Sequence, residues 1–295
     1  MVQRLSRSWL AIFAVFPQHR RIMLWASLFT APFGLTEPLF VPEYWSPPSL
    51  FDLARRTGFD IESIIFSFGL GGIGAVLYNL LTGNSSGSLA DHERLSPRHR
   101  LHTAAILAPA LAFPILAIFP LNPIFPAIGA MLLGAGAALL CRPDLVRKTW
   151  IGAALFIAYY AVFLAGLQLT APGYIARVWQ LNALTGLKIG GVPIEEFLFA
   201  AAFGAYWSGV YDHFTWRKPM PAPRRSAPLP TETARQPGVQ RSHVNSSTSR
   251  SNFLDDGCDP LPARHRWAHA RKRRALTTPL SRSHGKNAVH CTSLP

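Results

Sequence analysis

Residues 61–82 read IESIIFSFGLGGIGAVLYNLLT, which is apolar from its second turn to its end apart from a few small or hydroxyl side chains. A helix rises about 1.5 Å per residue, and the hydrocarbon core of a bilayer is about 30 Å thick, so about 20 apolar residues cross it. This stretch is therefore predicted to be a transmembrane helix. Its first turn carries one acidic residue, Glu62.

Five further stretches satisfy the same requirement for length and apolarity. The sequence thus predicts an all-α integral membrane protein with six transmembrane helices. The additional spans are Ile22–Phe40, Leu101–Pro120, Ile124–Leu140, Thr149–Thr170 and Pro193–Phe214.

Charge predicts how these spans are oriented. Cytoplasmic loops of membrane proteins are enriched in Lys and Arg. With the N-terminus inside, the inner loops hold ten basic residues and the outer loops hold four, namely Arg55, Arg56, Arg177 and Lys188. The predicted location is therefore the cell (inner) membrane, with both termini cytoplasmic.

A basic tail follows the last span. Residues 1–216 carry 14 Lys/Arg and 11 Asp/Glu, whereas residues 217–295 carry 15 and 4. Residues 218–295 are rich in Pro, Ser and Arg and lack apolar periodicity, so they are predicted to be a disordered cytoplasmic tail. Attraction to anionic lipid explains the charge more simply than nucleic-acid binding, and no nucleic-acid partner is expected.

An internal repeat divides the membrane-embedded part. The motif at Asp60–Phe66 recurs at Pro193–Phe199, an offset of 133 residues, and the same offset aligns Gly71 with Gly204, Tyr78 with Tyr211 and Asn79 with Asp212. We therefore predict two three-helix units, residues 1–100 and 101–217. The matched helix pairs have the same orientation, so the repeat is parallel and predicts a pseudo-twofold bundle whose acidic motifs face each other.

Four glutamates are the candidate catalytic residues. Glu62, Glu195 and Glu196 lie at the outer ends of two spans, where carboxylates can simply stabilise a helix N-terminus. Glu37 lies inside the first apolar stretch. Ionisable groups in a membrane are costly and usually functional. Apolar surroundings favour the protonated form of a carboxyl, so one such group can act as an acid while an ionised neighbour acts as the base.

Aromatic residues gather around both acidic motifs. Tyr44, Trp45 and Trp179 are interpreted as an interfacial belt, and Phe66 and Phe199 as either lipid-facing or part of a site. Aromatic faces can stabilise a carbocation through cation–π attraction, which is the functional alternative.

Other signals are missing. There is no dinucleotide-binding glycine motif, no DDxxD-like pair at a span end and no HxxxH cluster within a span. His92, His99 and His102 are interpreted as solvated, and the three cysteines (Cys141, Cys258 and Cys291) as free thiols. The sequence accordingly predicts neither a cofactor nor a metal.

The segment Gly191–Phe199, GVPIEEFLF, resembles the signature of the membrane-integral lycopene cyclase domain family, which includes bacterial heterodimeric cyclase subunits and the cyclase half of a fungal bifunctional enzyme. The resemblance covers about residues 20–216, as two fused units. Glu195 and Glu196 match the family's acidic pair. In the first unit Glu62 matches, but Asp60 replaces the proline and Ser63 replaces the second acid.

The resemblance implies a redox-neutral reaction, in which an acid protonates the end of a linear carotenoid, the cation closes a ring and a base removes a proton. A lycopene-like carotenoid is the implied substrate, and membrane lipid and carotenoid-pathway enzymes are the implied partners. Two alternatives stay open. One is a non-catalytic membrane scaffold or carrier of the same fold, and the other is an enzyme acting on another isoprenoid.

Overall fold

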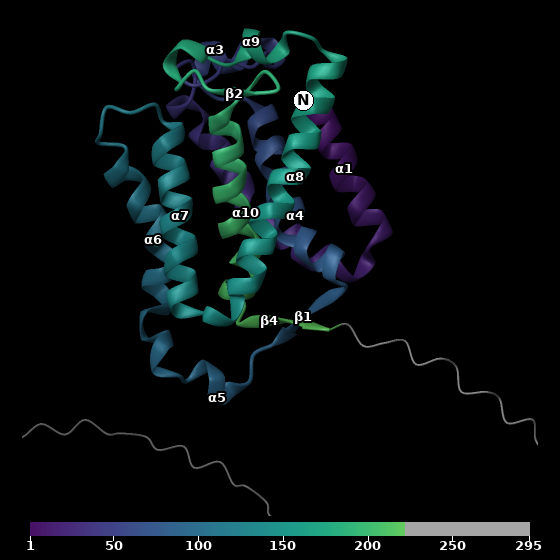
Figure 1. Cartoon of the computed structure of the whole chain (residues 1–295), viewed down its shortest axis with the longest axis vertical. Coiled ribbons are helices and arrows are strands. Elements are labelled where there is room, and N and C mark those ends of the chain that lie inside the picture. The colour runs from purple at the N-terminus through teal and green to yellow at the C-terminus, as the bar shows by residue number, and fades with distance from the viewer. Residues whose placement is uncertain (222–295) are drawn as a thin grey trace, which may run out of the picture. The chain divides into compact units, whose positions relative to one another are not determined.

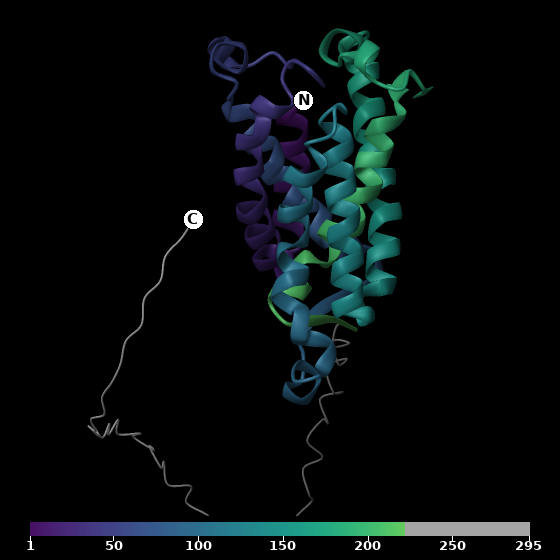
Figure 2. The same ribbon diagram turned by 90° about the vertical axis from the view of Figure 1, so that its left-hand side faces the viewer.

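The computed structural model of the chain describes residues 1–221, which form a bundle of roughly parallel and antiparallel helices (Figures 1 and 2). Short elements cap both ends of the bundle. In chain order the helices and strands are α1 (Val2–Val15), α2 (Arg20–Thr30), α3 (Leu53–Thr57), α4 (Ile61–Thr82), β1 (Asn84–Ser88), α5 (Asp91–Arg94), α6 (His102–Leu116), α7 (Ile124–Cys141), α8 (Val146–Thr170), α9 (Tyr174–Val178), β2 (Lys188–Ile189), β3 (Val192–Pro193), α10 (Ile194–Phe214) and β4 (Arg217–Pro221). The 3₁₀ turns are η1 (Pro17–His19), η2 (Ala31–Leu39), η3 (Leu50–Asp52), η4 (Pro97–Leu101), η5 (Pro143–Leu145) and η6 (Leu181–Ala183).

Two helices, α4 and α10, form the centre of the bundle. Helix α10 packs against α8, α7 and α4, while α4 packs against α2, α1 and α8. The start of α4 is fixed by Asp60, whose side chain accepts a hydrogen bond from the backbone N–H of Ser63 at 2.5 Å. Gly83, at φ +64°, ends the helix in the left-handed region.

Within residues 1–221, three helices are long and apolar enough to cross a membrane. They are α4, α7 and the helix that runs from η5 through α8, here Pro143–Thr170. Large apolar side chains, among them Leu28, Leu111 and Val162, are exposed on the outside of the bundle. A surface of this kind is typical of a protein surrounded by lipid. The prediction of a helical membrane protein is confirmed to this extent, whereas the number six stays a prediction.

The first predicted span, Ile22–Phe40, is not one continuous α-helix. Helix α2 ends at Thr30, and the chain continues as the 3₁₀ helix η2, which contains Pro32 and Pro38. Proline lacks the N–H that an α-helix interior needs, which explains the change. A Cβ on Gly34 would lie 2.5 Å from the Ile64 Cα, so η2 lies directly against the first turn of α4.

The N-terminal helix α1 was not among the predicted spans. It packs against α4, and its Arg4 Nη1 donates to the Gly166 carbonyl near the end of α8 at 3.0 Å. Met1 thus lies at the end of the bundle that carries α3 and α9, opposite β4 (Figure 1). The apolar pattern did not indicate α1, because Arg4 and Arg7 interrupt it. The cytoplasmic location of both termini stays a prediction.

Strands β1 and β4 form an antiparallel ribbon at the opposite end. Ser86 faces Pro219 at its centre, and Lys218 Nζ lies 2.9 Å from the Glu93 carboxylate. The tail predicted to be disordered from residue 218 therefore begins as a paired strand. The rest of that predicted tail, residues 222–295, lies outside the described residues.

Close contact between α8 and α10 depends on Gly204. A Cβ there would lie 2.6 Å from the Phe156 Cβ and 2.9 Å from the Ala153 Cα. We expect Gly204→Ala to lower the free energy of unfolding by about 1–3 kcal/mol, because the helices must separate. Gly136→Ala on α7 is the matched control, since a Cβ there meets nothing within 4 Å among the described residues, and it is expected to be neutral or slightly stabilising. Equal losses in both variants, measured by denaturant unfolding in detergent, would contradict this assignment.

Candidate functional site: a buried carboxyl in an aromatic cavity

Glu196 lies in the first turn of α10 and is only 3% exposed. Its Oε1 accepts hydrogen bonds from the Tyr44 hydroxyl and, at 2.6 Å, from Trp179 Nε1. Its Oε2 accepts one from the Tyr160 hydroxyl at 2.8 Å. Three donors from three separate segments thus hold one buried carboxyl in a fixed position.

The loops that supply two of these donors are paired with each other. Trp45 and Trp179 form an antiparallel β-bridge. The Gln180 N–H donates to the Tyr44 carbonyl at 2.9 Å, and the Ser46 N–H donates to the Val178 carbonyl at 2.7 Å. These bonds place Tyr44, from the first half of the chain, over a glutamate of the second half.

The Tyr44 phenol remains a hydrogen-bond donor over the physiological pH range. Burial raises the pKa of Tyr44 well above its ordinary value, and the nearby charge of Glu196 raises it further. The phenol therefore keeps its proton and can donate it in a hydrogen bond to the carboxyl.

A cavity of about 460 Å³ adjoins Glu196. Its polar lining includes Glu37, Ser63 and Glu196, and most of the remaining wall is aromatic or aliphatic. The aromatic residues of the wall are Phe29, Phe33, Phe40, Tyr44, Trp45, Phe66, Phe113, Tyr160, Trp179, Phe199, Phe203, Tyr206 and Trp207. Such a cavity suits an extended apolar ligand.

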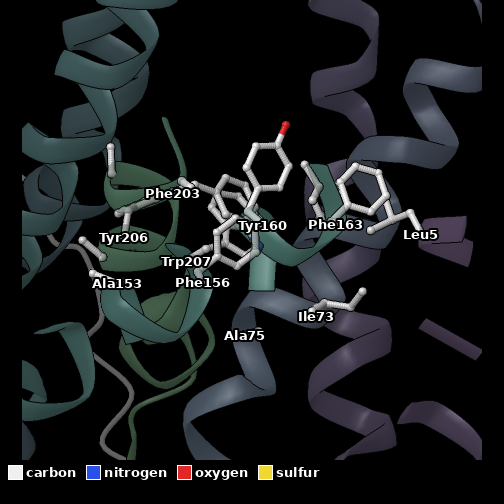
Figure 3. Packing of buried hydrophobic residues seen from close by; sticks show 14 of the residues in the cluster. Leu5, Ile73, Ala75, Ala153, Phe156, Tyr160, Phe163, Phe203, Tyr206 and Trp207 are labelled. Atoms are coloured by element: carbon white, nitrogen blue, oxygen red, sulfur yellow. The ribbon is translucent and has the colours of Figure 1, made fainter. Parts of the chain in front are cut away.

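Stacked rings form one side of this wall. Phe156, Tyr160, Phe203 and Trp207 lie together in Figure 3. The Phe156 and Phe203 ring centroids are 4.7 Å apart, and those of Phe203 and Trp207 are 5.3 Å apart. Three of these four residues line the cavity, so they present π-electron density to whatever occupies it.

Glu37 is the second acid of the cavity. It lies in η2, is 5% exposed, and has Ser63 and Trp45 as its polar neighbours. Its Oε1 has no hydrogen-bond partner among residues 1–221. A buried carboxyl oxygen without a partner is costly, and such groups are frequently functional. The close approach of Gly34 to α4 sets the position of this residue.

Glu62 and Glu195 have different surroundings from this pair. Glu62 Oε1 accepts from the Leu50 N–H at 2.8 Å, and Glu195 Oε1 accepts from the Thr185 N–H at 2.8 Å and from its hydroxyl at 2.7 Å. Neither residue lines the cavity. Of the four predicted glutamates, the structure brings together Glu37 and Glu196, while Glu62 and Glu195 each hold a loop at the same end of the bundle.

Tyr160 is not among the residues that the sequence predicts for the site, and Tyr44, Trp45 and Trp179 are predicted to be an interfacial belt. All four line the cavity, and three of them donate to Glu196. For Tyr160 a signal was available, because a tyrosine in the middle of an apolar span needs a partner for its hydroxyl. For Phe66 and Phe199 the structure favours the functional interpretation, since both line the cavity.

Fold and site together define a helical membrane protein with two carboxyls in an aromatic, apolar cavity. Such a site can donate a proton to a hydrocarbon, hold the resulting cation and take a proton back. Residues 122–214 match the family model for lycopene cyclase. This match supports the lycopene cyclase family, and a linear carotenoid as the substrate class. No curated protein and no solved structure matches the chain.

The matched residues comprise α7, α8, α9 and α10 with their connections. They include Tyr160, Trp179 and Glu196. Glu37 and Tyr44 lie outside the matched region, so their place in the site rests on the contacts described above.

Proposed function

We propose that this protein is a carotenoid end-group cyclase of the lycopene cyclase type, an intramolecular lyase (isomerase) that closes a ring by acid–base chemistry without a redox step. The observation that carries the proposal is the Glu196 carboxyl, fixed by three donors at the wall of an aromatic cavity that also contains Glu37. The family match over residues 122–214 supports the same reaction class.

In the proposed reaction Glu37 is the acid and Glu196 the base. Glu37 lacks a partner at Oε1 and is surrounded by apolar groups, which favours its neutral, proton-bearing form. It transfers its proton to the terminal double bond of the carotenoid. The adjacent carbon becomes a tertiary cation, and an internal double bond attacks it to close the six-membered ring.

Glu196 then removes a proton from a carbon next to the new cation, which restores a double bond. One proton enters and one leaves, so the product is an isomer of the substrate. Tyr44, Tyr160 and Trp179 act as positioning residues, because they donate to the Glu196 carboxylate and need not touch the substrate. The surrounding rings stabilise the cation between the two proton transfers.

The size of the cavity fits one end of the substrate. Pockets of about 300–1,000 Å³ enclose drug-sized ligands. At about 460 Å³, this cavity takes one end group, and the remainder of a long carotenoid extends beyond it. Each ring closure is then a separate event at the same pair of acids.

We also propose that two parallel repeats form this single site, one acid coming from each. The order α1–η1–α2–α3–α4–β1 resembles α7–η5–α8–α9–α10–β4 when η2 and η3 of the first series and η6, β2 and β3 of the second are left aside. Helix α6 is additional. The central ribbon pair, Ser86 and Pro219, is separated by the same 133 residues as the acidic motifs. The Trp45–Trp179 bridge joins equivalent loops at the other end. Both pairings are consistent with a pseudo-twofold axis along the bundle.

Expression of the intact chain in a lycopene-accumulating bacterial host tests the proposed function. Pigment analysis is expected to show a cyclic carotene that the empty host lacks. Glu195→Gln is the matched control on the adjacent residue and is expected to retain ring formation. Unchanged lycopene, with the intact chain demonstrated in the membrane, would exclude lycopene cyclisation and favour the non-catalytic scaffold or another isoprenoid reaction.

Tyr160 offers a finer test of how Glu196 is held. A hydrogen bond to a charged group contributes about 1.5–3 kcal/mol, so Tyr160→Phe is expected to lower kcat roughly 10- to 100-fold with little change in KM. Tyr159→Phe is the matched control, because the adjacent Tyr159 does not line the cavity and its hydroxyl does not bond Glu196. A fall of similar size in both variants, measured with substrate in detergent or vesicles, would show that the loss does not come from the bond between Tyr160 and Glu196.

A further inference from the structure

A cluster of two histidines and one cysteine lies at one end of the bundle. The first turns of α4 and α10, which carry Glu62 and Glu196, lie at the opposite end. One ligand atom from each of His99, His102 and Cys141 lies within 4.8 Å of the others. The Cys141 Sγ is 3.4 Å from His99 Nδ1 and 3.4 Å from His102 Nδ1. The sequence predicts that both histidines are solvated and that the cysteine is a free thiol, but in the structure both histidines are half-buried.

The local fold accounts for this convergence. His99 lies in the 3₁₀ turn η4, and His102 is the first residue of α6. The two residues are three apart where the turn passes into the helix, and their ring centroids are 6.4 Å apart with perpendicular planes. Cys141 is the last residue of α7, and it is buried beside them.

The two sulfur–nitrogen separations are close to those of a tetrahedral metal site, and the three ligand atoms lie within 4.8 Å of one another. With bonds of about 2.3 Å to sulfur and 2.0–2.1 Å to nitrogen, two ligands of a tetrahedral Zn²⁺ lie roughly 3.6 Å apart. The observed sulfur–nitrogen separations of 3.4 Å are close to that value. A thiol has one proton and can donate it to only one of the two nitrogens. If hydrogen bonds alone explained these contacts, the thiol would donate in one and accept in the other, although the two distances are equal.

Two further residues complete the surroundings. His213 is 2% exposed, its Nε2 has no hydrogen-bond partner among the described residues, and its ring centroid is 4.6 Å from that of His102. Its ring therefore adjoins the group, although it is not one of the three residues whose ligand atoms lie within 4.8 Å of one another. The Trp216 ring stacks on His102 at 3.9 Å and meets His99 edge-on at 5.0 Å. Trp216 adopts φ +54°, which is uncommon for a residue other than glycine.

Nearby cations do not prevent such a site. The Arg142 guanidinium is paired with Asp144 at 2.6 and 2.8 Å, and Arg94 lies over the Trp216 ring at 5.2 Å. The Asp144 carboxylate offsets the charge of Arg142, and the aromatic face of Trp216 accommodates the charge of Arg94.

We propose that His99, His102 and Cys141 bind one divalent cation of the zinc type, with His213 or water as the fourth ligand. Two imidazoles and a thiolate are the ligand types that Zn²⁺ prefers. The bound ion would join the start of α6 to the end of α7. Helix α6 also lines the cavity through Ile106 and Phe113. The ion would therefore hold one wall of the cavity in place without taking part in the reaction.

The test uses the purified full-length chain carrying Cys258→Ser and Cys291→Ser, which leaves Cys141 as its only thiol. Titration with Co²⁺ is expected to show one ion per chain, with a thiolate-to-metal absorption band and the intense visible bands of tetrahedral cobalt. Zn²⁺ is expected to displace the cobalt and to raise the thermal unfolding midpoint.

The variants locate the ion. His99→Ala is expected to weaken Co²⁺ binding at least roughly 10- to 100-fold, and Cys141→Ser to remove the thiolate band. His92→Ala, on exposed α5, is the control and is expected to bind normally. Because Cys141 is buried and its loss can impair folding, the half-buried His99 provides the deciding variant. Binding without the thiolate band, or unchanged by His99→Ala, would overturn the proposal and leave a hydrogen-bonded cluster.

Discussion

Glu37→Gln is expected to leave the linear carotenoid unconverted, whereas Glu196→Gln is expected to yield a ring with its double bond in a different position. Glutamine preserves the size of the side chain but neither donates nor accepts a proton in this way. General acid–base groups contribute about 10²–10⁴-fold to rate, so either variant loses most of its normal turnover. The two variants differ in the step that fails.

The difference follows from the order of the proposed steps. Without the acid no cation forms, so nothing downstream can occur. Without the base the cation still forms among the cavity's aromatic rings, and its proton leaves from another carbon or water adds to it. The same host and pigment analysis separates these outcomes, provided that ring isomers and hydroxylated rings are resolved chromatographically.

Glu195→Gln again serves as the control, since Glu195 holds Thr185 and does not line the cavity. If Glu37→Gln gave altered rings and Glu196→Gln left the substrate unconverted, Glu196 would be the acid and Glu37 the base. Normal product from both variants would show that neither carboxyl takes part in the reaction, which would contradict the proposed mechanism.

Much of the membrane-embedded fold could be predicted from apolar length alone. The predicted span Ile61–Thr82 coincides with α4, and Ile124–Leu140 and Thr149–Thr170 lie within helices that the structure confirms as long and apolar enough to cross a bilayer. The apolar pattern predicted the helices incorrectly where charged residues or prolines interrupt it. Arg4 and Arg7 obscured α1, and the prolines of η2 divided what looked like one span.

The candidate site was predictable only in part, because its contacts join distant segments. Glu37 and Glu196 stand out from sequence as acids in apolar stretches. The bonds that orient Glu196 come from Tyr44, 152 residues away, and from Tyr160, 36 residues away. The residue pattern within a single helix cannot predict contacts between segments that are so far apart in the chain. The repeat predicts that two acidic motifs face each other, and it shows that Ser63 stands in the first unit where Glu196 stands in the second. It could not show that Glu37 reaches the cavity from η2.

A second large effect is expected at the other end of the bundle, where Asp212→Asn should lower the free energy of unfolding by about 3–5 kcal/mol. The Lys148 Nζ lies 2.9 Å from Asp212 Oδ2, and the two side chains are 1% and 0% exposed. Asp212 Oδ1 also accepts from the Ser86 hydroxyl of β1. Asparagine preserves the shape of the side chain and removes its charge, so the Lys148 ammonium would remain buried without a counter-ion.

A double variant separates the ion pair from simple packing. Removing both charges, as in Lys148→Met with Asp212→Asn, is expected to cost clearly less than Asp212→Asn alone, because no buried charge is left unpaired. Asp52→Asn is the control for an exposed pair. Its partner Arg55 is 3.9 Å away, with exposures of 51% and 72%, and its loss is expected to change stability by less than about 1 kcal/mol.

Denaturant unfolding in detergent, followed by tryptophan fluorescence, measures Asp212→Asn, Lys148→Met, their combination and Asp52→Asn on one scale. Additive losses in the double variant would mean that Lys148 and Asp212 stabilise the bundle independently. That result would contradict a coupled ion pair and would instead assign the role of Asp212 to its bond with Ser86. A large loss from Asp212→Asn that the second substitution recovers would show that the pair fixes the junction of α8, α10 and the β1–β4 ribbon. The predicted repeat aligns Asp212 with Asn79, which is also buried but carries no charge.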